Sequence, residues 1–270
     1  EGRVLTMNNG AEQIFGYKKD EIIGKKRVSI FSPGEIVIQN VANWLATADK
    51  VGEFIGKTYF LKKDGTKLNA KIRITPLFGN GKDKPQTGYC GETVLIDENV
   101  DVPINFMTKV IKGVAITRVP FTSASLFPMF AIAAYYAGLG DGLFSVTSLI
   151  LSVIGVLFLH LSSNVFNDYF DVSDGTDEAN NEYFQPAGAA ITGGSRAIEL
   201  GIITLNGTKN VARALLAVSL LIASLLFYNI YNVTGSLVNV EGALYVGLAG
   251  LFLGYFYTAS PLRLVARRGL

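Results

Sequence analysis

Residues 143–166 read LFSVTSLILSVIGVLFLHLSSNVF, and residues 167–177, which follow directly, read NDYFDVSDGTD. The first stretch contains no Asp, Glu, Lys or Arg and is slightly longer than the ~20 residues that a helix needs to cross the hydrocarbon core of a bilayer. The second stretch supplies four aspartates in eleven residues. The pair therefore predicts a membrane-spanning helix that ends in an acidic cluster.

Polar residues at the end of this span share one helix face. His160, Asn164, Asn167 and Asp171 are spaced by 4, 3 and 4 residues, which keeps them within about 60° of one another, and Asp168 lies on the flank. Polar groups at membrane depth are unfavourable unless they face a cavity or a partner helix, so the stripe is a functional-site hypothesis. Two alternatives stay open: hydrogen bonding between helices for the two deeper residues, and a solvated acidic loop for the carboxylates.

Three further apolar segments, 119–139, 211–230 and 243–259, are long enough or nearly long enough to cross a bilayer. The connections at 140–142 and 231–242 contain no Lys or Arg. Basic residues instead flank the other ends of the spans, which by the positive-inside rule places the N-terminus, the 167–210 loop and the C-terminus in the cytoplasm. We expect a multi-pass protein of the cell membrane. These basic residues are Lys109, Lys112, Arg118, Arg196, Lys209, Arg213, Arg263, Arg267 and Arg268.

Charge is distributed unevenly along the 270 residues. Residues 1–112 carry 30 of the 46 Lys, Arg, Asp and Glu side chains, so a soluble domain is predicted to precede the membrane domain. The net charge of +2 and the lack of a long basic run argue against nucleic acid as a partner. The single cysteine, Cys90, excludes an intrachain disulfide and fits a reducing compartment. The first long apolar stretch starts near residue 119, so no signal peptide is expected. The chain lacks an initiator Met and stops at Leu270, which is consistent with a fragment.

The first hundred residues predict a small α+β domain. A short strand over 2–7 is followed by an Asn-Gly turn and a helix whose apolar face is Ala11, Ile14 and Phe15. Three later strands are predicted over 54–61, 67–76 and 88–96, and the Asp64-Gly65 pair between the first two is a hairpin signal. The expected sheet is antiparallel.

These residues resemble a PAS domain over about 1–98. The resemblance is carried by the Gly-Arg-Val-Leu…Phe-Gly-Tyr…Glu-Ile-Ile-Gly opening, the Lys-Asp-Gly-Thr hairpin and the closing Gly-Tyr-Cys-Gly-Glu-Thr strand. PAS domains sense ligands, light or redox state, or dimerise, so a PAS-mediated dimer is one expectation. Cys90 falls in a late strand rather than in a flavin-adduct motif, and the only histidine, His160, lies in the membrane half. The isolated domain is therefore expected to be colourless, with Cys90 packed as a small buried or edge-strand residue.

The acidic cluster resembles the first aspartate-rich motif of the UbiA prenyltransferases. The usual pattern is Asn-Asp-x-x-Asp-x-x-x-Asp. Here Gly175 occupies the last position and an acid follows at Asp177, the form associated with 1,4-dihydroxy-2-naphthoate prenyltransferases. Further matches are Thr-Gly-Gly-Ser-Arg at 192–196 and Tyr-Thr-Ala-Ser-Pro-Leu-Arg-Leu at 257–264, and the resemblance covers about 104–270. An EF-hand calcium loop does not fit this segment. If Gly175 took the glycine position of such a loop, the first ligand position would fall on Phe170, which has no oxygen ligand in its side chain.

The resemblance implies a Mg²⁺-dependent prenyl transfer. Asn167, Asp171 and Asp177 would hold Mg²⁺ against the diphosphate, and Arg196 would neutralise phosphate charge. The allylic carbon–oxygen bond would then ionise, and an electron-rich aromatic carbon would attack the carbocation. Asp171 and Arg196 are the implied catalytic residues. The implied substrate-binding residues are Asn164, Asn167, Asp168, Arg196, Tyr257 and Arg263.

The sequence thus predicts an α+β PAS domain over 1–98, a linker over 99–118, and an all-α, UbiA-like multi-helix transmembrane domain over 119–270 whose C-terminal part is missing. Without the second aspartate-rich motif of the family, we expect these 270 residues alone to show no turnover. A membrane-anchored PAS sensor without catalysis is the alternative function. A third interpretation is that two separate genes were joined near residue 100.

Overall fold

The computed structural model describes residues 2–81, 83–140, 144–174, 195, 197–198 and 200–264. The chain divides into two compact units. The described part of the N-terminal unit comprises residues 2–113 together with 197–203, apart from 82 and 199. The described part of the helical unit comprises 114–174, apart from 141–143, together with 195 and 204–264.

The N-terminal unit contains an antiparallel sheet of three strands in the order β1-β2-β3. β1 (Phe54–Leu61) pairs with β2 (Lys67–Leu77), and β2 pairs with β3 (Gly88–Leu95). The hairpin between β1 and β2 forms as predicted, because Gly65 has a φ of 85° and Lys62 N–H donates to the Thr66 carbonyl at 2.9 Å. Cys90 is exposed on the edge strand β3, which confirms the edge-strand interpretation.

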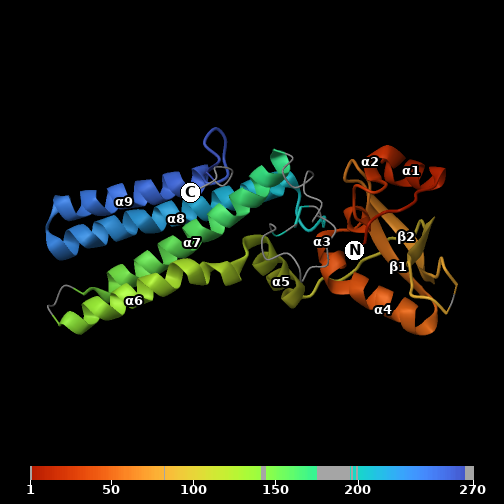
Figure 1. The fold of residues 1–270 in the computed structure, drawn as a ribbon, viewed down its shortest axis with the longest axis horizontal. Helices are drawn as coiled ribbons and strands as arrows, with labels where there is room; N and C mark the ends of the chain where they lie inside the picture. The colour runs from red at the N-terminus through yellow and green to blue at the C-terminus, as the bar shows by residue number, and fades with distance from the viewer. Residues whose placement is uncertain are drawn as a thin grey trace. The chain divides into compact units, whose positions relative to one another are not determined.

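Short helices accompany the sheet in the N-terminal unit (Figure 1), and they contribute buried side chains to its core. Asn8 caps the first helix by accepting a hydrogen bond from Ala11 N–H at 2.8 Å, and Gly16 ends it in the left-handed conformation. Phe15 is buried as expected, and its ring centroid lies 4.4 Å from that of Phe31. The helices are α1 (Asn9–Phe15), α2 (Lys19–Ile22), a 3₁₀ helix (Val28–Phe31), α3 (Gly34–Ile36), a π-helical stretch (Val37–Val41) and α4 (Ala42–Val51).

The strand predicted over 2–7 is wrong. Within the described residues this segment forms only an isolated bridge, between Arg3 and Arg27. Its backbone groups bond to the chain that follows α2, with Val4 N–H donating to Lys26 and Gly24 N–H donating back to Val4. Because these backbone groups are satisfied locally, the segment does not extend the sheet.

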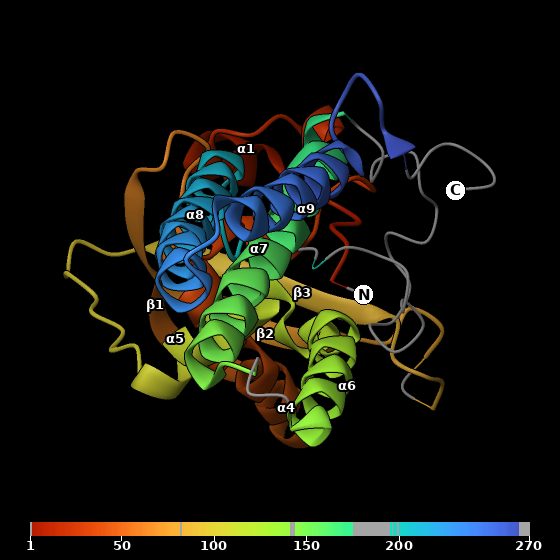
Figure 2. The same cartoon turned by 90° about the vertical axis from the view of Figure 1, so that its left-hand side faces the viewer.

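The helical unit is built from four long helices. The linker range 99–118 contains a further helix, α5 (Phe106–Thr117), and a 3₁₀ turn (Val119–Thr122) leads into the first of the four. α7 packs most extensively against α8, and Figure 2, which looks along the bundle, shows α7 flanked by the other three helices. The four are α6 (Ser123–Leu139), α7 (Val146–Ser173), α8 (Leu205–Thr234) and α9 (Leu237–Phe256).

Small residues bring α7 and α8 together. A Cβ on Gly155 would lie 3.4 Å from the Ile222 side chain, and Ser219 Oγ donates to the Gly155 carbonyl at 2.9 Å. Nearer the other end of the pair, Ser162 Oγ donates to the Ala212 carbonyl at 2.9 Å. Close packing of small residues with hydroxyl bonds to the backbone is typical of helices that associate in lipid.

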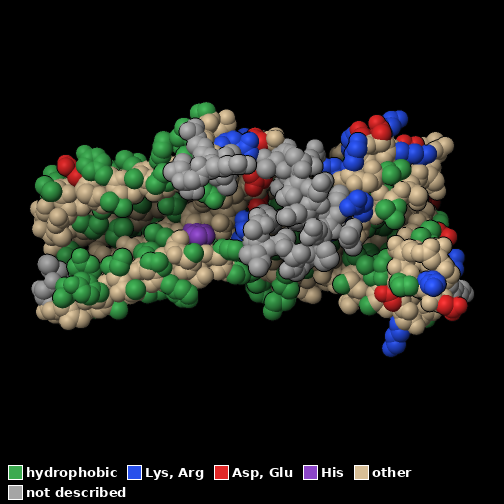
Figure 3. All heavy atoms as spheres, in the orientation of Figure 1, with side chains coloured by type: hydrophobic (Ala, Val, Ile, Leu, Met, Phe, Trp, Pro, Cys, Tyr) green, Lys and Arg blue, Asp and Glu red, His purple; other side chains and the backbone are tan. Residues whose placement is uncertain are grey.

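Four helices are long and apolar enough to cross a membrane, as judged by length and composition within the described residues. None of the apolar window of α9 is buried, and apolar side chains cover much of the helical surface in Figure 3. α7 begins three residues later than the predicted span 143–166 but continues seven residues past its end, and α8 extends beyond the predicted span 211–230 at both ends. Polar residues continue both helices where hydropathy falls. The 28 residues of α7 measure about 42 Å, longer than a hydrocarbon core of about 30 Å.

Candidate functional site

Asp168 is the buried centre of a polar cluster in the C-terminal half of α7. It is only 5% exposed, and both of its carboxylate oxygens accept the Ser195 backbone N–H, at 3.1 and 3.2 Å. Arg118 Nη1 lies 3.9 Å from Asp168 Oδ1. A buried carboxylate requires such partners, because an unpaired charge in a low-dielectric site is strongly unfavourable. The residue predicted on the flank of the stripe is thus held firmly by the protein.

Arg118 is a member of the cluster that the sequence interpretation missed. It follows α5 directly and adopts the left-handed conformation, with φ 54° and ψ 43°. This turn brings its guanidinium beside Asp168 and 4.6 Å from the Phe121 ring centroid. From the sequence, Arg118 was used only as one of the basic residues that set the orientation of the spans. Its position before a Pro-containing turn was the one available signal.

The deeper polar residues of α7 bond to the same part of the chain. Asn164 Nδ2 donates to the Thr117 carbonyl at 3.2 Å, and Ser125 Oγ lies 2.7 Å from His160 Nδ1. His160, Asn164 and Asp168 recur every four residues, so they form one row that faces residues 117–125. These bonds favour the alternative left open for His160 and Asn164, hydrogen bonding between neighbouring segments.

A second row on α7 faces the chain that follows α9. Thr258 Oγ1 donates to Asn167 Oδ1 at 2.7 Å, and Arg263 Nε lies 3.7 Å from Asp174 Oδ2. Thr258 is buried, whereas the preceding residue Tyr257, which the resemblance implied as a substrate-binding residue, is 47% exposed. The single polar stripe predicted from the sequence is therefore divided into two adjacent rows on α7. One row faces residues 117–125, and the other faces the chain that follows α9.

Asp171 lies one turn beyond Asn167 and is half-buried. Nearby on α7, the Tyr169 ring has Lys209 Nζ 5.4 Å from its centroid. The end of α7 thus brings the carboxylates of Asp168, Asp171 and Asp174 into a region that also holds the cations Arg118, Lys209 and Arg263. Mixed charge of this kind suits a polyanion bridged by a metal.

The predicted magnesium ligands are described only in part. Asp177 and Arg196 lie outside the described residues, and among the described ones no group of three or more His, Cys, Asp or Glu is placed to hold a metal ion. Asn167 and Asp171, one turn apart, do offer hard oxygen ligands, and Asn167 Oδ1 keeps a lone pair beyond its bond from Thr258. This pair fits the way Mg²⁺ binds, through one or two protein ligands and substrate phosphates.

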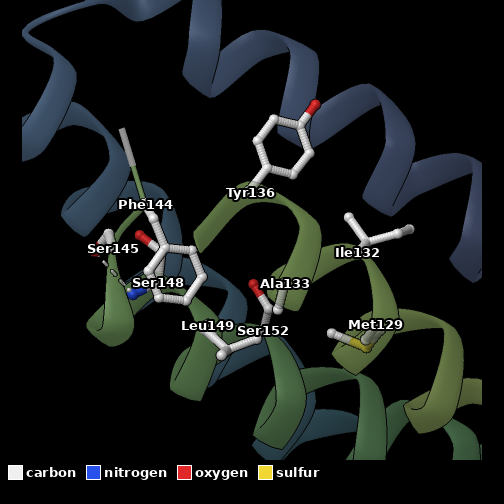
Figure 4. Close-up of a pocket in the computed structure, with 9 residues that line it drawn as sticks. All are labelled: Met129, Ile132, Ala133, Tyr136, Phe144, Ser145, Ser148, Leu149 and Ser152. Atoms are coloured by element: carbon white, nitrogen blue, oxygen red, sulfur yellow. Dashed lines mark hydrogen bonds between the residues drawn. The ribbon is translucent and has the colours of Figure 1, made fainter. Parts of the chain in front are cut away.

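An open groove of about 310 Å³ lies between α6 and the start of α7. Figure 4 shows Met129, Ile132 and Tyr136 of α6 opposite Leu149 and Ser152 of α7. Ser152 and Asp168 are sixteen residues apart on one helix, which corresponds to about 24 Å. The groove is therefore separate from the polar cluster.

The family model that matches this chain covers part of the N-terminal unit. The PAS domain family model matches residues 1–90. Two-component system protein A of Emericella nidulans is 31% identical over 81 residues, which are 30% of this chain and 12% of that protein. The PAS domain of a protein from Colwellia psychrerythraea, known from a crystal structure, is 22% identical, covers 35% of this chain and 78% of its own, and superposes with a TM-score of 0.33.

The family match and the antiparallel sheet with its short helices define the class of the first part of the chain. Residues 1–90 form a PAS domain, which indicates a sensory module, as the sequence predicted. The remainder is a helical region with four long apolar helices. The chain spans 12% of the length of the curated relative it matches.

Proposed function

We propose that this protein is a membrane-embedded prenyltransferase of the UbiA type, regulated by its PAS domain, that acts on a prenyl diphosphate and a dihydroxynaphthoate-like aromatic acceptor. The supporting observation is a convergence within the helical unit. Asp168 of the aspartate-rich motif bonds to Ser195 of the Thr-Gly-Gly-Ser-Arg motif. Asn167 bonds to Thr258, and Asp174 pairs with Arg263, both from the 257–264 motif. Three motifs that are distant in the sequence thus meet at one end of α7.

The residues of this end have distinct roles in the proposal. Asn167 and Asp171, with Asp177, would hold Mg²⁺, which when bound supplies positive charge to a diphosphate leaving group. Arg263 and Lys209 lie near the same helix end and add positive charge that attracts the polyanion. Asp168 already accepts a hydrogen bond from Ser195 and lies beside Arg118, so its role in the proposal is to position these neighbouring residues.

The length of α7 supports a position of the cluster at a membrane surface. With about 42 Å of helix and about 30 Å of hydrocarbon, roughly the last eight residues of α7 extend beyond the apolar core if the N-terminal end of the helix lies at the opposite surface. These residues include Asn167, Asp168 and Asp171. A diphosphate would then bind at the interface while its isoprenoid tail stays in an apolar environment. The positive-inside rule assigns this surface to the cytoplasm.

A membrane-anchored PAS sensor without catalysis is the second candidate. The observation in its favour is that Asp168, Asn164 and His160 have partners within the protein, as residues that only join helices would. This candidate gives no role to Asn167 and Asp171, the two residues on this part of α7 that offer hard oxygen ligands. Activity measurements separate the two candidates.

The test is prenyl transfer by the full-length protein in liposomes, with dihydroxynaphthoate or 4-hydroxybenzoate as the acceptor. We expect transfer to dihydroxynaphthoate when Mg²⁺ is present and none after the metal is removed with a chelator. A preference for hydroxybenzoate would be compatible with the proposed metal site but would contradict the proposed acceptor. No transfer to either acceptor, at any Mg²⁺ concentration, would favour the sensor without catalysis.

A further inference from the structure

His160 uses only one of its two ring nitrogens within the described part of the chain. Its Nδ1 lies 2.7 Å from Ser125 Oγ, a contact that joins α7 to α6. The other nitrogen, Nε2, has no hydrogen-bond partner among the described residues, and it is not one of their fully buried unpaired polar atoms. The side chain as a whole is half-buried. The contact between the two helices therefore accounts for Nδ1 but gives no role to Nε2.

The depth of His160 makes a nitrogen without a partner unfavourable. If roughly the last eight residues of α7 extend beyond the apolar core, His160 lies about five residues, or roughly 8 Å, inside it. A polar group at this depth faces a cavity or a partner rather than lipid, because hydrocarbon offers it no hydrogen bond. A ligand that binds beside α7 would supply the missing bond.

His160 lies on the same face of α7 as the proposed metal ligands. Asn167 follows it by seven residues, which is nearly two turns, and Asp171 follows Asn167 by four more. At 100° per residue, all three fall within about 40° of one another around the helix axis. Along the axis, His160 and Asn167 are about 10 Å apart. This face of α7 thus presents polar groups at two depths.

The separation of about 10 Å suits the two substrates of the proposed reaction. A diphosphate near Asn167 and Asp171 would direct its allylic carbon toward the deeper part of this face. The attacking aromatic carbon must approach that carbon to within about 3–3.5 Å. The remaining distance is on the scale of one phosphate group and one aromatic ring. The far side of the acceptor ring would therefore lie near His160.

A ring hydroxyl is the group that best matches Nε2. In a neutral imidazole one nitrogen donates a hydrogen bond and the other accepts one, so the role of Nε2 depends on the direction of the bond between Nδ1 and Ser125. A hydroxyl both donates and accepts, and it therefore pairs with Nε2 in either tautomer. An ionised carboxylate only accepts and would pair with one of the two tautomers.

We propose that His160 is a specificity-determining residue that binds a ring hydroxyl of the aromatic acceptor through Nε2, while Ser125 holds the imidazole in place through Nδ1. That the bound compound is the acceptor rests on the proposed function, whereas the recognition of a hydroxylated aromatic compound does not. The bond selects among aromatic compounds by their hydroxyl groups. It also fixes the depth of the ring below the diphosphate.

The experiment measures binding of naphthoates to the 270-residue chain in detergent, by equilibrium dialysis under reducing conditions. The probes are 1,4-dihydroxy-2-naphthoate and the two analogues that each lack one hydroxyl, 1-hydroxy-2-naphthoate and 4-hydroxy-2-naphthoate. The parent chain should bind one of the two analogues about 2- to 10-fold more weakly than the dihydroxy compound, the fold-change expected for one neutral hydrogen bond.

Two substitutions of His160 separate the roles of its nitrogens. His160→Asn places an amide near the position of Nδ1 and can keep the contact with Ser125, but it has no group at the position of Nε2. It should bind the dihydroxy compound and the disfavoured analogue equally. His160→Gln carries its amide to about the position of Nε2 and should keep most of the preference. Ser219→Ala is the matched control, because it removes a different hydrogen bond to α7, from Ser219 Oγ to the Gly155 carbonyl, and should keep the full preference.

The ratio of two dissociation constants protects the test against misfolding, because an unfolded fraction lowers the amount of probe bound without changing that ratio. A residue that only joined α6 to α7 would give the same ratios in every variant. Equal ratios in the parent chain and His160→Asn for both analogues would overturn the proposal. A parent chain that bound none of the three probes would overturn it as well.

Kinetics of the full-length protein distinguish this proposal from the proposed function. His160→Asn should raise the KM for dihydroxynaphthoate by about 2- to 10-fold and leave the KM for the prenyl diphosphate unchanged. Prenyl transfer with an unchanged acceptor KM would be compatible with the proposed function but would contradict the role of His160. Discrimination among the naphthoates through His160, in a protein without transferase activity, would support the hydroxyl site and contradict the proposed function.

Discussion

At the scale of single residues, Asp168 and Asp171 show how far sequence reasoning reaches. Spacing along a helix predicts that both lie near one face, because that follows from helix geometry alone. Spacing does not reveal that Asp168 is buried against Ser195, since that contact joins residues 27 positions apart. The same limit applies to Arg118, whose left-handed backbone no local pattern required.

Thr58 supplies a prediction about stability. Its side chain is fully buried in β1, and its hydroxyl oxygen has no hydrogen-bond partner among the described residues. Thr58→Val keeps the shape and removes an unpaired polar group, so we expect the free energy of unfolding of the PAS domain to rise by about 1 kcal/mol. Thermal unfolding of the full chain in detergent, followed by Trp44 fluorescence, measures the change. A lower midpoint would show that the hydroxyl has a partner in solution.

At the scale of elements, predictions succeeded where one local signal sufficed. The Asp64-Gly65 hairpin and the capped helix α1 formed because their turn chemistry is local. The opening strand did not form because a strand needs a partner strand in the sheet, whereas the backbone of this segment bonds to residues 24–28 instead. Hydropathy located the spans but not their ends, since a helix continues through polar residues after it leaves the apolar region.

The ion pair between Lys112 of α5 and Glu35 of α3 supplies a prediction about pH. Burial acts to raise the pKa of the Glu35 carboxyl, but the hydrogen bond from Lys112, a hydrogen bond from the backbone N–H of Glu35 itself, and the charges of Lys112 and Lys109 together lower it below its ordinary value. A lowered folded-state pKa means that the pair stabilises the fold at neutral pH and that this contribution is lost as the pH falls through the folded-state pKa.

Glu35→Gln should therefore lower the midpoint of Trp44 unfolding at pH 7 by an amount that corresponds to about 0.5–1 kcal/mol, the scale of a partly screened pair. The difference from the wild type should shrink below pH 4.5. Glu98→Gln, which removes the exposed pair with Lys57, is the control and should change little. A difference that persists at acidic pH would mean that Glu35 acts through packing rather than through its charge.

At the scale of the whole molecule, the uneven distribution of charge predicted a polar N-terminal part and a membrane part. The structure has a PAS domain followed by four long apolar helices. Composition did not predict that residues 197–198 and 200–203 belong to the N-terminal unit, although residues on both sides of them in the sequence belong to the helical one. Their close approach to residues 29–34 depends on two glycines, Gly34 and Gly201, which are about 170 positions apart, and no local pattern links them.

Sidedness is the prediction that belongs to the whole molecule. On a Cys90→Ser background, an Asp141→Cys variant should react with an impermeant maleimide added outside intact cells. Asp174→Cys should react only after the membrane is opened, because basic residues flank its end of the spans. The reverse pattern would place the polar cluster outside the cell and remove the cytoplasmic assignment.

The central claim is that the end of α7 binds a prenyl diphosphate through Mg²⁺. The most direct test is the affinity of the chain for a non-reactive prenyl diphosphate analogue, with and without Mg²⁺. We expect Mg²⁺-dependent binding that Asp171→Asn weakens by about 10- to 100-fold, the range seen when metal sites are perturbed, with a smaller loss for Asn164→Ala. Glu241→Gln, a matched loss of charge on the exposed start of α9, should bind like the wild type. Equal affinity of Asp171→Asn and the wild type, or binding that does not depend on Mg²⁺, would contradict the account.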